Sequence, residues 1–241
     1  MSSSGADAGD RALFGQAEVG PGVRFELEVP AGSREVPEGD LPAVNVAGLP
    51  GVSVALRRGF RIFGDGARGG DGGDEGSIFV GCVRGPSDKW APGVEELVLA
   101  RATSIARGSI GADLERLDAR PIRVDKLVID QRLSGEGTRL TKPAVVEVRH
   151  LLVFAGEARE GVLCSVACVE PRGPGSISRC GDVVASASFE GALMEAPPPS
   201  LLVRLILAAA ERPLHAGVLL AVLGLGLAAL VLARRPRPRP L

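Results

Sequence analysis

Hydrophobic and polar residues alternate strictly in residues 23–29. Val23, Phe25, Leu27 and Val29 fall on one face of an extended chain, and the charged residues between them fall on the other. A period of two predicts a half-buried β-strand. Two shorter and less sharply bounded strands are expected after it, over residues 43–48 and 52–64.

Apolar runs in the second half of the chain predict further strands. Residues 77–83 and 122–133 each have strand character. Residues 144–156 and 161–170 are two long apolar runs separated by the polar sequence EARE, which predicts a β-hairpin. Both faces of the second arm are apolar, which is typical of a central strand.

Two segments have the pattern of α-helices. Apolar residues recur at helical spacing from Val94 to Ile105, with Pro92 near the start and Gly108 at the end. A closing helix is expected over residues 176–193, because a serine precedes its apolar positions and is a favourable N-cap.

Near the C-terminus, residues 214–233 carry no charged side chain. At about 1.5 Å per residue, some 20 helical residues match the thickness of a bilayer, so this run predicts a transmembrane helix inserted in the lipid. Arg234 and Arg235 follow it directly, as in tail anchors. Small residues form a stripe on the helix that would allow close contact with a partner helix or a weak homodimer. The stripe consists of Gly217, Ala221, Gly224 and Ala228.

Two rules disagree about the orientation of this helix. The excess of arginines in the tail favours a cytoplasmic tail and an exported domain. Residues 1–20, however, lack the basic and apolar regions of a signal peptide, which favours a cytoplasmic domain. We therefore expect a single-pass protein of the bacterial inner membrane with its domain in the cytoplasm, and an exported domain is the alternative. Residues 200–212 form an apolar helix that either lies in the headgroup layer or packs on the domain.

The remaining organisation follows from composition. Residues 1–20 are small and polar and are expected to be disordered. Residues 21–193 form one α+β domain, interrupted by a Gly-rich insertion at 64–77 whose aspartates do not have the spacing of a calcium loop. Residues 194–213 link the domain to the membrane helix, and residues 234–241 form the tail.

Charge and aromatic content argue against nucleic-acid binding. The chain of 241 residues has a formal net charge of −1, one tryptophan and no tyrosine. It therefore lacks the basic surface that binds nucleic acids and has few aromatic side chains to stack on bases.

The four cysteines are Cys82, Cys164, Cys168 and Cys180. They form no CxxC pair, and only two histidines accompany them, so no metal site is expected. Cys164 and Cys168 would lie about 13 Å apart in a strand, too far to bond to each other. Buried free thiols in a reducing cytoplasm are expected. An exported domain would instead pair Cys168 with Cys180.

The order of elements resembles the PsbP-like fold, which includes DcrB-like bacterial proteins and chaperones of type VI secretion effectors. The resemblance is carried by FELEVPAG (25–32), the helix that begins at Val94, the hairpin at 146–171 and CGDVVASASF (180–189). It implies an antiparallel sheet flanked by two helices, to which the chain would add one transmembrane helix. It also implies binding of another protein rather than catalysis, and it supplies no catalytic residue.

Three functions follow from these observations. The first is a membrane-tethered, non-catalytic module that binds another protein or acts as a chaperone, without a cofactor. The second is an exported structural protein of the envelope, anchored at its C-terminus. The third is a thiol-dependent enzyme with Cys164 as nucleophile and His150 as base. Because His150 shares a strand face with apolar residues, a buried core histidine is the simpler interpretation.

Overall fold

The computed structural model describes residues 11–44, 46, 51–62, 76–87, 99, 103–104, 113–139, 142–156, 160–172 and 178–196. The chain divides into two compact units, Met1–Pro197 and Pro198–Leu241, and every described residue belongs to the first. The expected insertion (apart from its last two residues), the helix at 200–212 and the membrane segment lie outside the described residues.

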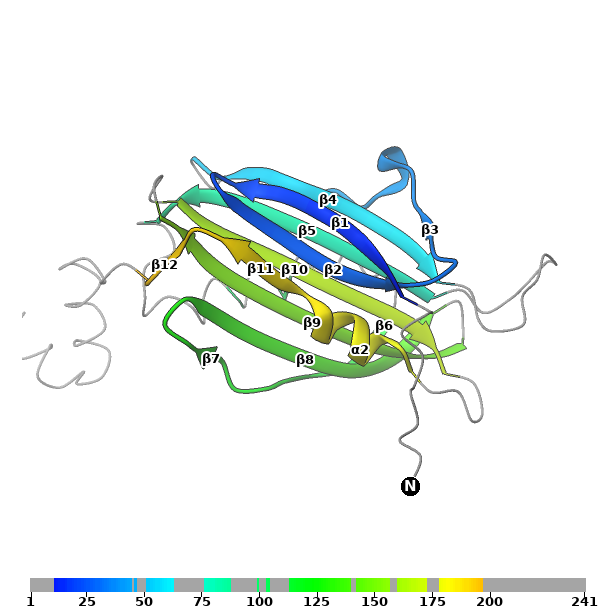
Figure 1. Ribbon diagram of the computed structural model, residues 1–241. Helices are drawn as coiled ribbons and strands as arrows, with labels where there is room; N and C mark the ends of the chain where they lie inside the picture. The colour runs from blue at the N-terminus through cyan, green and yellow to red at the C-terminus, as the bar shows by residue number, and fades with distance from the viewer. Residues whose placement is uncertain are drawn as a thin grey trace, which may run out of the picture. The chain divides into compact units, whose positions relative to one another are not determined.

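The larger of two antiparallel sheets has β5 and β10 near its centre (Figure 1). Its main path runs in the order β3 (Arg34–Glu35), β4 (Ser53–Ile62), β5 (Gly76–Pro86), β10 (Glu160–Pro171), β9 (Lys142–Ala155), β8 (Val128–Arg139) and β6 (Asp113–Ala119). Two short strands lie off this path: β7 (Arg123–Val124) pairs with β8, and β12 (Leu193–Met194) pairs with β9.

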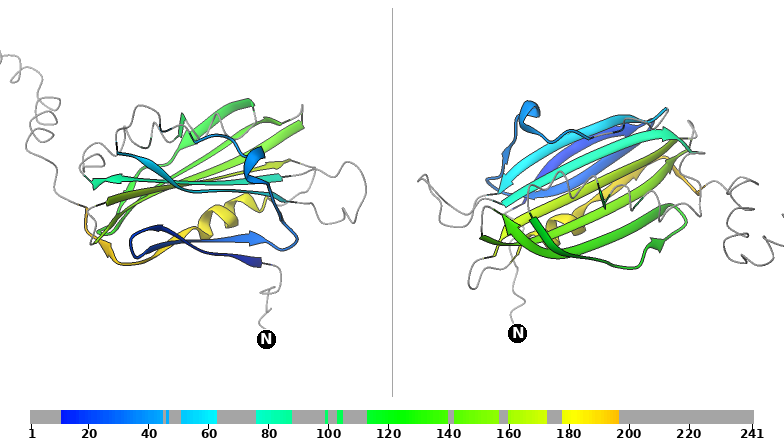
Figure 2. Two further views of the ribbon diagram at one scale, coloured as in Figure 1. Left: turned by 90° about the horizontal axis from the view of Figure 1, so that it is seen from above. Right: turned by 180° about the vertical axis from the view of Figure 1, so that it is seen from behind.

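The smaller sheet lies against one face of the larger one (Figure 2). It consists of β1 (Arg11–Gly20), β2 (Val23–Pro30) and β11 (Ser188–Gly191), in that order, so β11 is an edge strand. The helix α2 (Cys180–Ser186) packs beside it on β2, β9 and β10. A 3₁₀ turn, η1 (Glu38–Asp40), follows β3.

The main hydrophobic core fills the space between these two layers. Residues of β2 alternate between buried and partly exposed positions, as their sequence period predicts. Alternate residues of each strand point to the same face of the sheet. The inward-facing side chains of β4, β5, β9 and β10 pack against those of β2 and α2. The core includes Phe25, Leu27, Ile62, Ile78, Val153, Val162, Val166 and Val183.

The opposite face of the larger sheet carries two smaller apolar clusters. One lies around Val146 and Val148 of β9, and the other around Leu152 and Phe154. Leu99, a helical residue, is fully buried in the second cluster. Leu99, Thr103 and Ser104 are the described part of the helix expected from Val94 onward.

The predicted α+β class with two flanking helices and a transmembrane helix is wrong. The described residues are mostly in strands, and α2 is the one α-helix whose bounds they define. The expected closing helix at 176–193 is reduced to seven residues, and its second half instead forms β11 and β12. This segment pairs with the edge of β2, and the tertiary pairing overrides the local helical pattern.

The start of the chain also differs from expectation. Residues 11–20, predicted to be disordered, form β1 and pair with β2. The pairing register shifts between Phe14 and Ala17 and again between Glu18 and Gly20. These irregularities break the period of two, so the sequence alone does not indicate a strand.

The expectation of a single-pass inner-membrane protein is corrected by the structure. No helix in the described part of the chain is both long enough and apolar enough to cross a bilayer. The segment on which that expectation rested, residues 214–233, lies outside the described residues, as do its small-residue stripe and the arginines after it. These positions are Gly217, Ala221, Gly224, Ala228, Arg234 and Arg235.

Candidate ligand-binding cleft

A cleft of about 510 Å³ opens beside the free edge of β11, a size suited to a small ligand or a short peptide segment. Its floor is the inward face of β8 and β9, and its walls are β7 and the segment from α2 to β11. The lining combines apolar side chains, those of Val128, Leu151 and Phe189, with charged side chains. The lining residues are Arg123, Val124, Asp125, Val128, Asp130, Arg149, Leu151, Ala187, Ser188 and Phe189.

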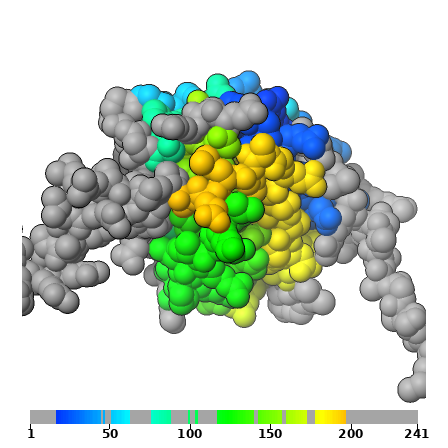
Figure 3. Space-filling model, turned by 60° about the vertical axis from the view of Figure 1, so that its left-hand side comes forward, coloured from blue at the N-terminus to red at the C-terminus, as the bar shows by residue number. Residues whose placement is uncertain are grey.

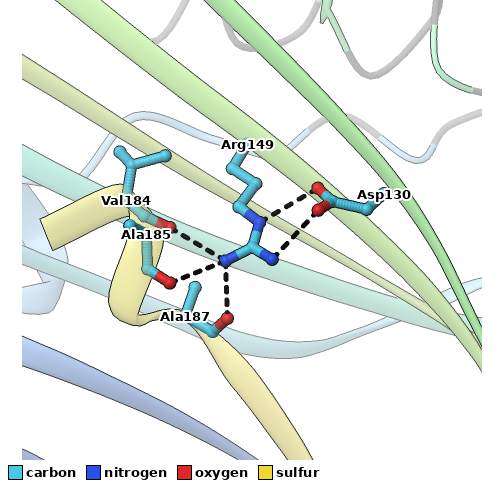
Figure 4. Close-up of polar contacts among 5 residues, drawn as sticks. All are labelled: Asp130, Arg149, Val184, Ala185 and Ala187. Carbon is cyan, nitrogen blue, oxygen red and sulfur yellow. Dashed lines mark hydrogen bonds and ion pairs between the residues drawn. The ribbon is translucent and has the colours of Figure 1, made fainter. Parts of the chain in front are cut away.

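A rigid ion pair crosses the floor of the cleft (Figure 4). Arg149 Nε donates to Asp130 Oδ1 at 2.9 Å, and its Nη2 donates to Asp130 Oδ2 at 3.0 Å. The two side chains are only 12% and 15% exposed. A two-point arginine–carboxylate bond of this kind fixes orientation as well as distance, so the floor has one defined geometry.

The same guanidinium also holds the C-terminal end of α2. Arg149 Nη1 donates to the carbonyl oxygens of Val184 (3.2 Å), Ala185 (2.9 Å) and Ala187 (2.8 Å). The last carbonyls of a helix lack partners within the helix and carry partial negative charge, so a cation there is favourable. Arg149 therefore joins the floor of the cleft to one of its walls.

The N-terminal end of α2 is fixed by a disulfide. Cys180, its first residue, is bonded to Cys168 of β10. Glu170, on the same strand, accepts hydrogen bonds from the backbone nitrogen of Arg179 at 2.8 Å and from Arg179 Nε at 3.4 Å. Both ends of the seven-residue helix are thus tied to the larger sheet, and the wall that follows it is held in place.

The outer wall of the cleft exposes apolar surface. Val124 is 65% exposed, and Leu127, in the turn between β7 and β8, is 40% exposed. In Figure 3 the β7–β8 region (green) and the α2–β12 region (yellow to orange) form neighbouring parts of one surface. Exposed apolar side chains beside a cleft are typical of a binding surface.

On the opposite face of the sheet, His150 is fully buried. Its Nδ1 lies 2.8 Å from Ser165 Oγ, and its Nε2 lies 3.2 Å from Thr103 Oγ1. Burial lowers the pKa of His150 to about 4, so the ring is neutral at pH 7. With both nitrogens satisfied, His150 is a core histidine, as the simpler interpretation held.

The hypothesis of a thiol-dependent enzyme is contradicted by the geometry. Cys164 is bonded to Cys82 of β5, and it points to the face of the sheet opposite to His150. It has no free thiol to act as a nucleophile. The expectation of four reduced cysteines is also wrong, because both disulfides are formed and no free cysteine remains. The pairing expected for an exported domain, Cys168 with Cys180, is confirmed.

Glu147 lies two residues before Arg149 on β9 and on the same face of the sheet. Burial raises its pKa, and the charges of Arg120 and Arg132 act in the opposite direction. These residues do not line the cleft. Within the described ranges, no group of three or more His, Cys, Asp or Glu side chains is placed to hold a metal ion.

The roles of Arg149 and Asp130 were not predicted from the sequence. One feature of the sequence could have indicated Arg149. It is a charged residue inside a predicted strand, and the residues before and after it, Val148 and His150, are buried. Such a residue needs a partner, because an unpaired charge in the interior is costly. The partner, 19 positions earlier, is identified only by the pairing of β8 with β9.

No family model matches the chain, so the resemblance to PsbP-like proteins is not shown. No curated protein matches either. Among solved structures, the chain is similar to LpqN of Mycobacterium tuberculosis, which is described as involved in cell envelope biogenesis. The identity is 11%, the TM-score is 0.41, and the match covers 74% of this chain and 91% of LpqN.

Proposed function

We propose that the protein is a non-catalytic binding module that takes an amphipathic ligand in the cleft beside β11. The observation that carries this proposal is one concave site in which apolar side chains lie beside a largely buried, two-point Arg149–Asp130 pair. Ligand sites are commonly mainly apolar, with a few fixed polar groups that set orientation. Covering the exposed Val124 and the partly exposed Phe189 would supply affinity, and the ion pair would orient the ligand.

The module acts outside a reducing cytoplasm in this proposal. Two disulfides, Cys82–Cys164 and Cys168–Cys180, support an oxidising compartment, because such bonds persist there and are rare in cytosolic proteins. The second bond also fixes a wall of the cleft, which reduces the ordering cost of binding.

The test uses the full chain and the dye 8-anilinonaphthalene-1-sulfonate, which fluoresces in apolar sites. Val124→Asp places a negative charge at the cleft wall and should weaken binding of this anionic dye several-fold. Val54→Asp is the matched control: Val54 is also an exposed strand valine, at 43%, and it does not line the cleft. Equal dye affinity of the two variants would contradict a ligand site in this cleft.

A further inference from the structure

The cleft has a feature that the proposed function does not use, which is the free backbone edge of β11. Among the strands that the structure describes, β11 pairs with β2 on one side and with none on the other. Its other side faces the cleft, since Ala187, Ser188 and Phe189 line it. An unpaired strand edge presents backbone N–H and C=O groups that can pair with another chain.

The register of β11 and one backbone hydrogen bond establish which backbone groups of this strand point toward β2. Ser188 lies opposite Glu26, and Glu190 lies opposite Arg24. In the same register, the backbone N–H of Ala192 donates to the carbonyl of Gly22. Because opposed residues of an antiparallel pair alternate between hydrogen-bonded and non-hydrogen-bonded, the backbone groups of Ser188 and Glu190 also face β2.

Odd-numbered positions face the other way, because backbone groups alternate in direction along a strand. Ala187 confirms this alternation: its carbonyl points away from β2 and accepts from Arg149 Nη1 at 2.8 Å. Two residues later, the N–H and C=O of Phe189 point to the same side, into the cleft. The described part of the chain provides no strand that pairs with them there.

Arg149, on the floor of the cleft, supplies one more hydrogen-bond donor beside β11. Arg149 donates to Asp130 from Nε and from one hydrogen of Nη2. The two hydrogens of Nη1 are shared by the carbonyl oxygens at the end of α2, those of Val184, Ala185 and Ala187. A guanidinium has five N–H groups, so one Nη2 hydrogen has no acceptor among the described residues. It can donate to a carbonyl group in the cleft.

We infer that the ligand of the cleft is an extended polypeptide segment that adds to the free edge of β11 as a fourth strand of the smaller sheet. This inference rests on the proposed function and names its ligand class. The N–H and C=O of Phe189 pair with the backbone of the added strand. An apolar side chain of that strand packs on Val128 and Leu151, and one of its carbonyls accepts from Arg149.

A backbone ligand fits the charges of the site better than an anionic amphiphile does. Asp125 and Asp130 line the cleft together with Arg123 and Arg149, so the charges of the lining side chains sum to zero. A neutral partner with alternating donors and acceptors suits such a surface. Backbone pairing then gives affinity, and the apolar part of the floor, Val128 and Leu151, selects the side chain.

The test begins with a random peptide library displayed on phage and selected on the intact, oxidised chain. Selected peptides are synthesised with N-methyl groups at single positions, which remove one N–H donor each. Methylation at positions that face β11 should weaken binding about tenfold or more, and methylation at the alternate positions should have little effect. Val124→Asp should weaken peptide binding more than Val54→Asp does.

The outcomes separate this inference from the proposed function. If the dye binds in a Val124-dependent manner and no selected peptide competes with it, strand addition is wrong and the cleft still binds an amphiphile. Peptide binding that is equally sensitive to methylation at every position would also overturn strand addition. If neither dye nor peptide distinguishes Val124→Asp from Val54→Asp, the proposed function fails as well.

Discussion

Arg149 and Asp130 form a two-point ion pair, with distances of 2.9 and 3.0 Å, at the junction of three elements. The pair joins β9 to β8, and Arg149 also donates to the end of α2. One side chain thus joins the floor of the cleft to the wall carried by α2 and β11. Its removal should affect stability and binding together.

Replacing Arg149 with Met should lower the free energy of unfolding by about 3 kcal/mol, because Asp130 and the three carbonyls would lose their partner in a largely buried position. Urea unfolding measures the change. Arg172→Met is the control, since Arg172 pairs with Glu136 where the side chains are 59% and 67% exposed. It should cost less than about 1 kcal/mol. Equal losses would contradict a special role for Arg149.

His150 should make the protein sensitive to mild acid. The pKa of its ring is about 4 in the folded protein and about 6.5 in an unfolded chain. As the pH falls from 6.5 to 4, the unfolded state binds a proton that the folded state does not bind. Stability is therefore complete above pH 6.5, is lost through this window by about 3 kcal/mol, and changes no further from this residue below pH 4.

The measurement compares unfolding free energies of the wild type and His150→Gln at several pH values. The variant should lose less stability between pH 6.5 and 4. Glu147 acts in the opposite direction, because its pKa is raised in the folded protein and acid therefore favours folding there. It is present in both proteins and cancels in the comparison. Parallel pH profiles would show that His150 does not titrate as stated.

Gly191 should tolerate no side chain. Its φ is +119°, and an added Cβ would overlap the carbonyl oxygen of Gly22. Gly191→Ala should therefore lower stability by more than about 2 kcal/mol and displace the edge strand that lines the cleft. Gly181→Ala is the matched control: nothing lies within 4 Å of its added Cβ, and alanine favours the helix by about 1 kcal/mol. Thermal unfolding should move in opposite directions for the two variants.

Local pattern predicted the parts of the fold in which one face of a strand is buried. The alternation of β2 gave its inward residues correctly, and the apolar runs at 144–156 and 161–170 form the expected hairpin. The same reasoning failed where pairing is irregular or imposed from a distance. Irregular pairing breaks the period of two in β1. Pairing with the edge of β2 makes the second half of an expected helix form the strand β11.

The cleft was not predictable for a related reason. Its residues come from β7, β8, β9 and β11, which are far apart in the sequence and meet only through strand pairing. The link between Cys82 and Cys164 likewise depends on the register of β5 with β10, across 82 positions. Single-sequence patterns describe which face of a strand is buried, and they do not describe which strands are neighbours.

The two disulfides should be present in the cell and should contribute unequally to stability. The Cys82–Cys164 bond closes a loop of 82 residues and the Cys168–Cys180 bond closes one of 12. Because a longer loop restricts the unfolded chain more, loss of the first bond should cost about 4.5 kcal/mol and loss of the second about 3 kcal/mol. Urea unfolding of the paired Cys→Ala variants measures both.

The second bond should also matter for binding, because it holds the N-terminal end of α2, which leads into the cleft wall. Cys168→Ala with Cys180→Ala should therefore weaken dye binding more than Cys82→Ala with Cys164→Ala, although it destabilises the protein less. The oxidised state itself is tested by trapping cells with acid and adding an alkylating agent. It should label none of the four cysteines before reduction and all of them afterwards. Free thiols in the trapped protein would contradict both the bonds and the proposed oxidising compartment.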